Sequence, residues 1–318
     1  MVICMRSKHV LVITGPTAAG KTALGVELAL AHGGEIVSAD SMQLYAHMDI
    51  GTATPTAEEM RGIPHHMLSV VSPLEAYSVS RYVEDAAHCV DDILSRGKLP
   101  IIVGGTGLYI DALIAVRDFA PMQSETLRAE LNAKYAALGG EEMLREMAQF
   151  DAPNAQKLNA NDKKRILRAF EVYELTGKPQ SQHDAETQAV PPRYDAVRIA
   201  LDFEERDTLY TRIDARVDMM MAAGLLSELC TLLEMGVTDE HTALQAIGYR
   251  ELLQMIRGEF PLDEAIALIK QHSRQYAKRQ LTWLRNREDT RRISWLDAPD
   301  LARGVADSTD FLREARYS

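Results

Sequence analysis

The chain has few cysteines and no long apolar segment, and both absences narrow the class of protein. Cys4, Cys89 and Cys230 stand far apart without any CxxC pairing, so neither a disulfide framework nor a zinc cluster is indicated. No apolar run approaches the roughly 20 residues that a membrane helix needs. We therefore expect a cytoplasmic protein without a signal peptide or membrane attachment.

Repeats and low-complexity tracts are also missing. With 318 residues, 46% hydrophobic and 25% charged, the chain can bury one large core or two modest ones. Its net charge of −11 argues, taken alone, against nucleic-acid binding, because phosphate backbones repel acidic surfaces. Between Lys270 and Arg292, however, eight basic residues stand against two acidic ones. The sequence therefore allows an acidic body with a basic stripe.

A complete phosphate-loop motif stands near the start of the chain. Residues 15–22 read GPTAAGKT, which matches the GxxxxGK[ST] pattern of ATP- and other nucleotide-binding loops. An apolar run at 10–13 precedes it, and an apolar-rich helix is expected at 22–32. Glycines let successive amide hydrogens turn toward one anion, a lysine adds charge, and a threonine hydroxyl can hold Mg²⁺. The predicted diphosphate or triphosphate site comprises Gly15, Pro16, Thr17, Ala18, Ala19, Gly20, Lys21 and Thr22.

The remaining pattern predicts an α/β fold with an insertion. Strand-like segments at 10–15, 35–40 and 99–107 alternate with helical ones, which indicates a parallel P-loop core, and a further strand is expected at 197–203. We expect the first part of the core at 1–120, a helical insertion at 121–190, and core completion with basic helices at 191–318. Gly177 and Pro179 are expected to end the last helix of the insertion. After Asp207 the chain is expected to be helical nearly to its end.

Two polar residues follow core strands, where open α/β sheets place their ligands. Asp40 ends the run EIVSAD, and Thr106 lies among glycines after IIV. A carboxylate beside a diphosphate can bind Mg²⁺ or take a proton from a nucleophile. Asp40 can equally be a helix cap or turn residue, and Thr106 part of a plain strand-to-helix turn.

Two basic sets fall on expected helices. In a helix over 262–288, Lys270, Arg274, Lys278 and Arg285 share an arc of roughly 80°, with hardly any acids among them. A second set in the insertion comprises Lys163, Lys164, Arg165 and Arg168. Each set predicts a polyanion-binding face, with a merely solvated face as the alternative.

Two other features favour a structural interpretation. The adjacent pair His65 and His66 has no evident third metal ligand, so we expect packing or hydrogen bonding instead of a metal site. The methionines at 219–221 are expected to fill gaps in the core.

Eight ordered motifs resemble one family. They are GPTAAGKT, DSMQLYAHMDIGTATP, PHHM, YSVSRY, IIVGGTGLYIDAL, RVDMMMAAGLLSE, AIGYRE and YAKRQLTWLRNR, and together they are similar to the tRNA dimethylallyltransferases over about residues 10–287. The resemblance implies transfer of a dimethylallyl group from dimethylallyl diphosphate to the exocyclic amine of the adenosine 3′ to the anticodon. Where the family has a Pro-rich run in the insertion, this chain reads FAPMQSETLR, which differs from the pattern.

The resemblance also implies roles for residues. Lys21, Thr22 and the loop amides, with Mg²⁺ and Arg216, would neutralise pyrophosphate; Asp40 would accept the amine proton and Thr106 would position the amine. The enzyme is expected to be a monomer that binds the anticodon stem-loop. The implied tRNA contacts are Asp40, Ser41, Met42, Gln43, Thr106, Arg128, Lys164, Arg165, Ile166, Leu167, Arg168, Gln245, Ala246, Ile247, Gly248, Tyr249, Arg250, Lys278, Arg279, Gln280, Leu281, Thr282, Trp283, Leu284 and Arg285.

Two rival functions remain. A small-molecule or nucleoside kinase would share the loop and the sheet, and ATP would then be the productive ligand. A non-catalytic RNA-binding protein with a vestigial loop is less consistent with the intact Lys21–Thr22 pair.

Overall fold

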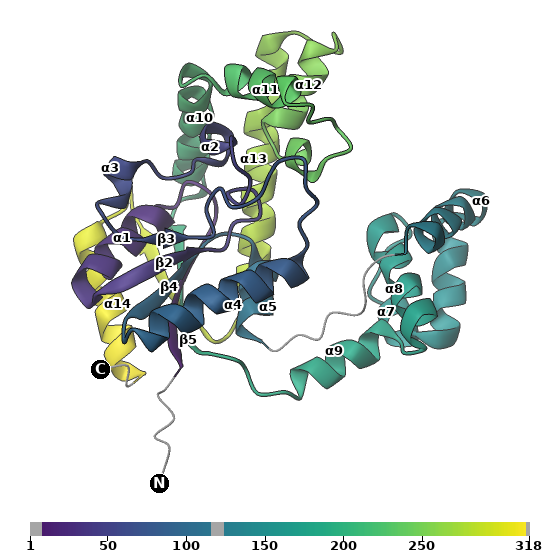
Figure 1. Cartoon of the computed structure of the whole chain (residues 1–318), viewed down its shortest axis with the longest axis horizontal. Coiled ribbons are helices and arrows are strands. Elements are labelled where there is room, and N and C mark those ends of the chain that lie inside the picture. Colours follow the sequence, from purple (N-terminus) through teal and green to yellow (C-terminus); the bar gives the residue numbers. More distant parts are fainter. Residues whose placement is uncertain (1–7, 116–123, 316–318) are drawn as a thin grey trace. The chain divides into compact units, whose positions relative to one another are not determined.

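A computed structural model describes residues 8–115 and 124–315, which fall into two compact units (Figure 1). Unit 1 spans Met1–Ile114 and Tyr194–Ser318, and unit 2 spans Ala115–Arg193. Each unit has its own hydrophobic core. The two are therefore described separately.

Unit 1 is built on a six-stranded sheet in the order β3-β2-β4-β1-β5-β6. All neighbouring strands are parallel, and β1 is central, with Leu11 opposite both Ile101 and Val197. The predicted parallel α/β class is confirmed. The strands are β1 (His9–Thr14), β2 (Gly34–Ser38), β3 (His65–His66), β4 (Leu99–Val103), β5 (Asp195–Phe203) and β6 (Thr290–Trp295).

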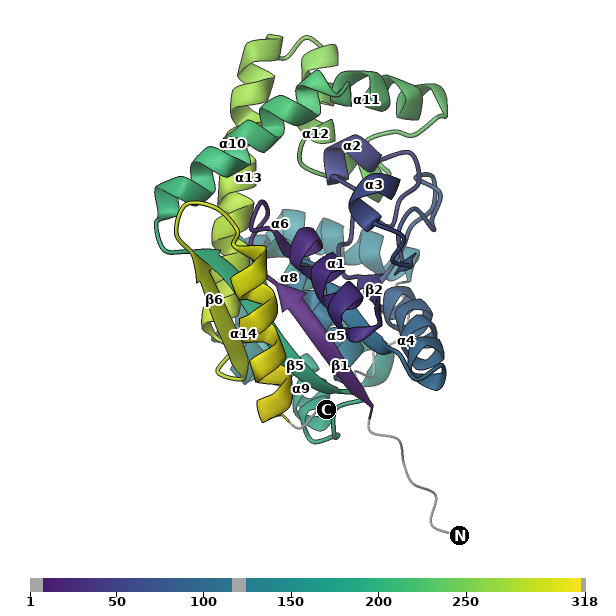
Figure 2. The same ribbon diagram turned by 90° about the vertical axis from the view of Figure 1, so that its left-hand side faces the viewer.

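Helices cover the sheet, which explains why its central strands are apolar on both faces. Residues 10–13 of β1 are fully buried. Helices α1 and α14 pack together, and α10 runs alongside α13 (Figure 2). The helices of unit 1 are α1 (Lys21–His32), α2 (Asp49–Thr52), α3 (Ala57–Met60), α4 (Val79–Ser95), α5 (Gly107–Ile114), α10 (Arg206–Ala222), α11 (Leu225–Glu234), α12 (Tyr249–Ile256), α13 (Leu262–Arg285) and α14 (Leu301–Glu314).

Local signals fix where several of these helices begin and end. Ser78 caps α4 by accepting a hydrogen bond from the backbone of Arg81, and Asp300 caps α14 in the same way through Arg303. Gly33 ends α1 in the left-handed conformation, at φ 64°, which glycine adopts without steric cost. Each of these residues therefore marks one end of its own helix.

The expectation of helix from Asp207 nearly to the chain end is wrong at residues 290–295. This segment is β6, which extends the sheet beyond β5. Its buried residues Ile293 and Trp295 alternate with less buried ones, a period of two that the neighbouring arginines obscured.

Unit 2 is helical. Met143, Met147, Ile166 and Phe170 form the centre of its core. Helix α6 is interrupted at Gly139, which has a non-helical backbone with φ 76°. The helices are α6 (Glu125–Phe150), α7 (Ala152–Ala155), α8 (Lys163–Thr176) and α9 (Gln180–Gln188).

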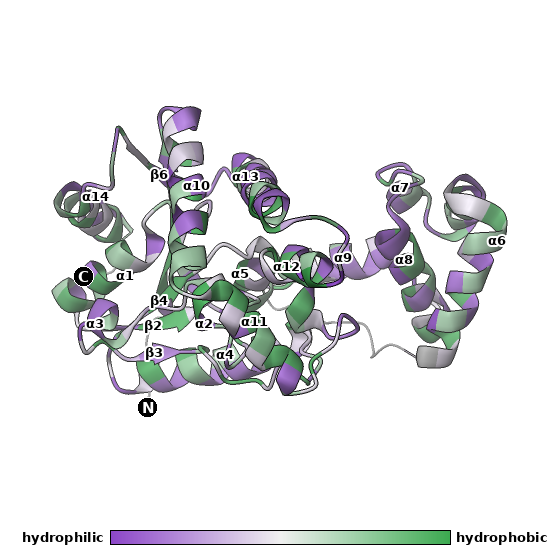
Figure 3. Ribbon diagram, turned by 90° about the horizontal axis from the view of Figure 1, so that it is seen from above, coloured by the Kyte–Doolittle hydropathy of each residue, from purple (hydrophilic) through white to green (hydrophobic). Residues whose placement is uncertain are grey.

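Gly177 does end α8, but α8 is not the last helix of the insertion. Pro179 is the N-cap of a further helix, α9, so the expectation that the last helix of the insertion ends at Gly177 and Pro179 is wrong. Helix α9 is mainly hydrophilic (Figure 3) and therefore lacks the apolar stripe by which helices are recognised.

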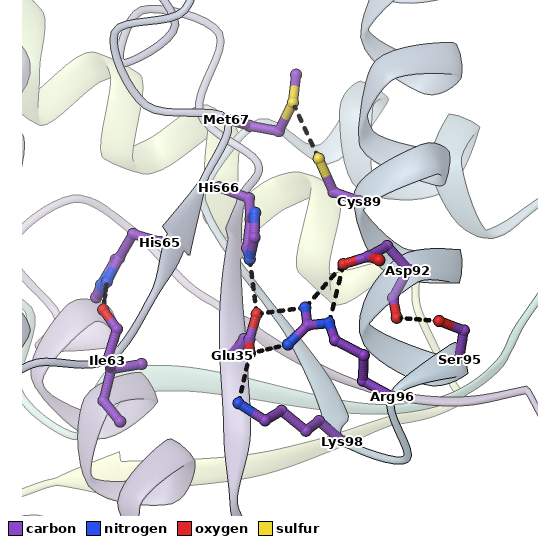
Figure 4. A network of polar contacts seen from close by, with 10 residues as sticks. All are labelled: Glu35, Ile63, His65, His66, Met67, Cys89, Asp92, Ser95, Arg96 and Lys98. Carbon is purple, nitrogen blue, oxygen red and sulfur yellow. Dashed lines mark hydrogen bonds and ion pairs between the residues drawn. The ribbon is translucent and has the colours of Figure 1, made fainter.

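A polar network surrounds Glu35 near the beginning of β2, at the opposite end of this strand from Asp40 (Figure 4). Buried Glu35 accepts hydrogen bonds from Arg96, Lys98 and His66. The Arg96 guanidinium is the largest cause that holds the pKa of Glu35 well below its usual range. The network ties the start of β2 to the segment between α4 and β4.

The two histidines behave as expected. His66 bonds Glu35, and His65 Nδ1 lies 2.8 Å from the Ile63 carbonyl. Within the described parts of the chain, no group of three or more His, Cys, Asp or Glu side chains could hold a metal ion. The expectation for the methionines is wrong for Met219, which is 64% exposed on α10, whereas Met220 and Met221 are half-buried.

None of the helices described here combines the length and the apolar character needed to cross a membrane.

Candidate functional site

The phosphate loop connects β1 to α1 and depends on its two glycines. Gly15 has φ 147°, and a Cβ there would lie 2.5 Å from the Leu201 carbonyl oxygen. Gly20 has φ 83°, and a Cβ there would lie 2.9 Å from Pro299. Ala18 between them also has a positive φ, of 64°. The loop therefore packs tightly against β5 and against the segment that follows β6.

Side chains from distant elements hold the backbone of the loop. Arg212 of α10 donates to the Ala18 carbonyl at 3.2 Å, and the indole of Trp295 in β6 donates to the Ala19 carbonyl at 3.0 Å. The motif itself gives no indication of these partners. Both engage carbonyl oxygens and so do not occupy the amide hydrogens of the loop, the groups that can turn toward an anion, although the Thr17 and Ala19 amides are bonded within the protein.

Two cations and one acid interact around the loop. Lys21 donates to the Pro16 carbonyl at 2.7 Å. Burial and the charge of Arg216 lower the pKa of Lys21 to about 8, against the opposing effect of Asp40. Burial lowers the pKa of Arg216, which Asp40 and Glu59 counteract. The structure therefore brings the predicted residues Lys21, Arg216 and Asp40 into one electrostatic cluster, whose desolvated cations suit a highly charged anion.

The ends of β2 and β4 meet beside this cluster. Thr106 accepts a hydrogen bond from the Ser41 amide at 3.1 Å, and its own amide donates to the Ala39 carbonyl at 3.2 Å. Asp40 accepts from the Met42 amide at 3.0 Å, so it also has the turn role that the sequence allowed. Asp40 and Thr106, predicted separately, therefore lie on two loops that bond to each other.

Tyr276 of α13 joins this group, although nothing in the sequence marked it. Burial is the largest cause that raises its pKa to about 12, and the charge of Asp40 adds to it. Hydrogen bonds with Thr106 and Gln280 act in the opposite direction. An aromatic residue that recurs with apolar residues at helical spacing indicates the buried face of a helix. For this reason the sequence did not mark Tyr276 as a site residue.

The three residues after Asp40 differ in how far their side chains are engaged by hydrogen bonds within the protein. Ser41 and Met42 are half-buried. Gln43 accepts from the Ser38 hydroxyl at 2.9 Å and donates to the carbonyls of Thr52 and Ala53. Its amide is therefore engaged within the protein.

The predicted tRNA contacts at 245–250 divide by exposure. Gln245 and Arg250 are exposed and Ile247 is half-buried, whereas Ala246, Gly248 and Tyr249 are buried. The exposed Arg250 bonds the buried carboxylate of Glu251 at 2.7 Å.

The buried side chain of Tyr249 forms contacts within the protein and is not exposed to solvent. Its hydroxyl donates to Glu228 at 2.6 Å, and the same carboxylate accepts the amides of Ile50 and Gly51. A Cβ at Gly51 would lie 2.5 Å from the Tyr249 ring. Tyr249 therefore packs against α2 from within the protein.

The basic stripe expected on α13 is narrower than the sequence indicated. Lys270 pairs with Asp218 at 2.7 Å, and Arg274 pairs with Asp214, both acids lying on α10. The sequence showed few acids along α13 itself, but it could not show acids from a neighbouring helix. The exposed predicted residues of α13 are Lys278, Arg279, Thr282 and Arg285.

The other predicted residues of α13 face inward. Leu281 and Leu284 are buried in the core of unit 1, and Gln280 is 7% exposed. The half-buried Trp283 donates its indole hydrogen to Asp111 at 3.2 Å. Side-chain contacts between RNA and the buried members are therefore not available in this conformation.

Three further arginines counted in the basic region also have partners. Arg287 pairs with Asp111, and Arg291 pairs with Glu314 at 3.0 Å. Arg292 donates to the Leu284 carbonyl at 2.9 Å. Because Arg291 and Arg292 lie on β6, they do not continue the surface of α13.

Unit 2 carries its own cationic surface. Lys164, Arg165 and Arg168 line a hollow of about 320 Å³ together with Asn154, Leu158 and Gln180. Arg128 of α6 and Arg168 of α8 both pair with Glu171, which is fully buried. The neighbours Ile166 and Leu167 are buried in the core of this unit, so their side chains support the surface from beneath.

Comparisons with known proteins match most of the chain to one kind of transferase. A family model described as IPP transferase matches residues 43–287, and one described as isopentenyl transferase matches residues 8–72. The tRNA dimethylallyltransferase of Acetivibrio thermocellus is 45% identical over 290 residues, which cover 91% of each chain. That of Shouchella clausii is 46% identical over 286 residues, or 90% of this chain and 91% of the relative.

Solved structures give the same picture. The tRNA isopentenylpyrophosphate transferase of Bacillus halodurans superposes with a TM-score of 0.72 at 37% identity, covering 97% of this chain and 98% of its own. A eukaryotic dimethylallyltransferase acting on tRNA superposes with a TM-score of 0.81 at 30% identity, covering 97% and 80%.

Proposed function

The chain belongs to the IPP transferase family, and from this we propose that it is a tRNA dimethylallyltransferase. It transfers a dimethylallyl group from dimethylallyl diphosphate to the exocyclic N6 amine of the adenosine on the 3′ side of the anticodon, and it releases diphosphate. We further propose that it works as a monomer in the cytoplasm.

One observation carries the proposal beyond family membership. The phosphate loop, with Lys21 and Arg216, shares an electrostatic cluster with Asp40, whose segment is bonded to Thr106. The groups that we propose as anion site and as proton acceptor therefore lie together at the carboxyl ends of the strands, where α/β sheets bind ligands. Strand β4 is followed by Gly104 and Gly105 instead of an acid, a composition that does not favour a phosphoryl-transferring enzyme.

The proposed reaction is the substitution of diphosphate by the adenine amine, and each of these groups has a part in it. The bond between adenine N6 and the allylic carbon forms as the bond between that carbon and the diphosphate oxygen breaks. Loop amides, Lys21 and Arg216 stabilise the charge that develops on the departing diphosphate. Asp40 accepts the proton that N6 loses, and Thr106 orients the amine for attack.

Mg²⁺ is the cofactor we propose. Thr22 is the second residue of α1, directly after Lys21, and is half-buried, so its hydroxyl can contribute one oxygen ligand. Mg²⁺ commonly takes only one or two protein ligands and completes its shell with phosphate oxygens and water, which suits this sparse set of ligands. When bound, the ion supplies positive charge to the leaving diphosphate.

The proposed RNA partner is the anticodon stem-loop of tRNA. Its adenine must leave the base stack to reach Asp40, and this typically costs a few kcal/mol that contacts with the protein must offset. The exposed cations of α13 and of unit 2 are the groups that can hold the phosphate backbone.

A transfer assay with a conservative variant tests the proposal. Labelled dimethylallyl diphosphate, Mg²⁺ and an unmodified tRNA transcript should give labelled RNA, and a transcript with guanosine at the target position should not. Asp40→Asn keeps the oxygen that accepts the Met42 amide but cannot take a proton at neutral pH. We expect its kcat to fall about 10²- to 10⁴-fold with RNA affinity retained.

The outcomes separate the possible functions. Unchanged turnover in Asp40→Asn would remove this residue as the base. Transfer of the γ-phosphate of ATP to a small molecule, without prenyl transfer, would show a kinase instead.

A further inference from the structure

One face of α13 follows the loop that connects β4 to α5. Tyr276, Gln280 and Trp283 recur at spacings of four and three, so they project from one side of this helix. Tyr276 contacts Thr106, and a Cβ at Gly107 would lie 2.4 Å from the Trp283 ring. The same loop that carries Thr106 is therefore fitted against this helix.

Gln280 differs from the other members because it reaches two loops at once. Its Nε2 donates to the Gly105 carbonyl at 3.0 Å, and its Oε1 accepts from the Thr17 amide at 2.9 Å. Thr17 belongs to the phosphate loop, and Gly105 precedes Thr106. A single carboxamide therefore joins the loop proposed to hold the donor to the loop proposed to position the acceptor.

The contact is close and enclosed. Gln280 is 7% exposed, and a Cβ at Gly105 would lie 2.1 Å from its Nε2. A glutamine carboxamide presents a donor and an acceptor in one plane at this reach. A glutamate would place a second acceptor against the Gly105 carbonyl, and a leucine would leave two buried backbone groups without this partner.

The other side of the helix faces solvent. Lys278, Arg279, Thr282 and Arg285, on either side of Gln280 in sequence, are exposed. The helix that offers cations to RNA therefore holds the diphosphate loop through its inner face.

We propose that Gln280 is a positioning residue that fixes the phosphate loop relative to the Thr106 loop, and that it does not contact RNA. This rests on the proposed function. Both ends of the carboxamide are already engaged within the protein, whereas the neighbouring exposed residues are available to a polyanion. Without the bridge, the Thr17 amide and the Gly105 carbonyl lose their common partner, and the loop loses a constraint on its anion-binding conformation.

The test compares two variants of Gln280 with a matched control on the same helix. Gln280→Leu removes both hydrogen bonds, and Gln280→Glu removes the donor alone. Gln275→Leu makes the same change at an exposed position of α13. Each protein is assayed for the KM of dimethylallyl diphosphate, kcat, the Kd of inorganic pyrophosphate by calorimetry, and the Kd of an anticodon stem-loop RNA.

We expect Gln280→Leu to raise the donor KM and the pyrophosphate Kd roughly tenfold, because it removes two partly buried hydrogen bonds. The RNA Kd should change less than twofold, and Gln275→Leu should match the wild type in every measurement. Gly105→Ala provides an independent variant, since its Cβ would displace the carboxamide from the other side and should give the same rise in donor KM.

Several results would overturn the proposal. A Gln280→Leu protein with a wild-type donor KM and pyrophosphate Kd would show that the bridge is unimportant, even if its melting temperature fell. A selective loss of RNA affinity would make Gln280 an RNA contact. If the wild type transfers no prenyl group, the proposed function fails, but the pyrophosphate titrations still test Gln280.

Discussion

At the scale of single residues, Lys21 has a lowered pKa that has a measurable consequence. Burial and the neighbouring Arg216 favour its neutral form, so that its pKa is about 8. A lysine with its ordinary pKa would stay charged through the whole physiological range. In this protein the charge of the Lys21 side chain, which a bound phosphate would pair with, therefore depends on pH.

We predict that binding of pyrophosphate to the free enzyme weakens as the pH rises through about 8. The neutral amine that forms above this pH cannot pair with the anion, and the lowered pKa places this change at a lower pH than for an ordinary lysine. Calorimetric titrations between about pH 6.5 and 9.5 measure the effect. Lys21→Arg is the control, because its guanidinium remains charged and should give a flatter profile. A wild-type profile as flat as that of Lys21→Arg would contradict the prediction.

The sequence predicted those residues of the proposed site that belong to a motif or that directly follow a core strand. The motif located Lys21, and the position after a parallel strand brought Asp40 and Thr106 to one edge of the sheet. Tyr276 was not predicted, and Gln280 was predicted only as an RNA contact, because a side chain that points inward from a helix follows the same period whether it packs or positions a loop. Their role depends on which loop faces the helix, which is a property of the tertiary structure.

At the scale of elements, α13 shows how partners on another helix change the meaning of a charge pattern. Lys270 and Arg274 belong to the same sequence stripe as Lys278 and Arg285. The first two are paired with acids of α10, whereas Lys278 lies over the ring of Tyr210 and Arg285 is exposed. Only the later turns of the helix therefore offer cations to a polyanion.

We predict that the double variant Lys278→Ala and Arg285→Ala weakens RNA binding, and that Lys270→Ala hardly does. Removing one cation that pairs with a phosphate should reduce the slope of log K against log salt by about 1, so the double variant should reduce it by about 2. Fluorescence anisotropy with an anticodon stem-loop at several salt concentrations measures both the affinity and the slope. An equal effect of Lys270→Ala would show that its pair with Asp218 opens when RNA binds.

Two elements could not be predicted because their sequences hide the usual period. The strand β6 carries two arginines between its start and Ile293, which made it read as an extension of the basic helix before it. Helix α9 is mainly polar and follows a proline, so it lacks the apolar stripe that indicates a helix. The core strands were predictable because continuous apolar runs allow little else.

At the scale of the whole molecule, an acidic chain must bind a polyanion through local surfaces. The net charge of −11 repels RNA in general, and five of the eight basic residues between Lys270 and Arg292 are bonded within the protein. The cations around the hollow of unit 2 therefore assume a larger share of the proposed binding. Unit 2 also has a hydrophobic core of its own, so we expect that unit 2 can be removed without loss of the chemistry of unit 1.

We predict that replacing residues 115–193 with a flexible Gly/Ser linker of about 12 residues leaves the diphosphate site intact and removes most RNA affinity. The sheet, the phosphate loop and α13 all lie in unit 1, so pyrophosphate should bind with a Kd within about threefold of the wild type. The RNA Kd should rise by more than about tenfold, because the shortened protein lacks the cations that line the hollow of unit 2, Lys164, Arg165 and Arg168. A full-length Arg165→Ala and Arg168→Ala protein is the matched control and should show part of the same effect. If the shortened protein no longer binds pyrophosphate, unit 1 depends on unit 2 for its fold; if it binds RNA like the wild type, α13 alone supplies the RNA surface.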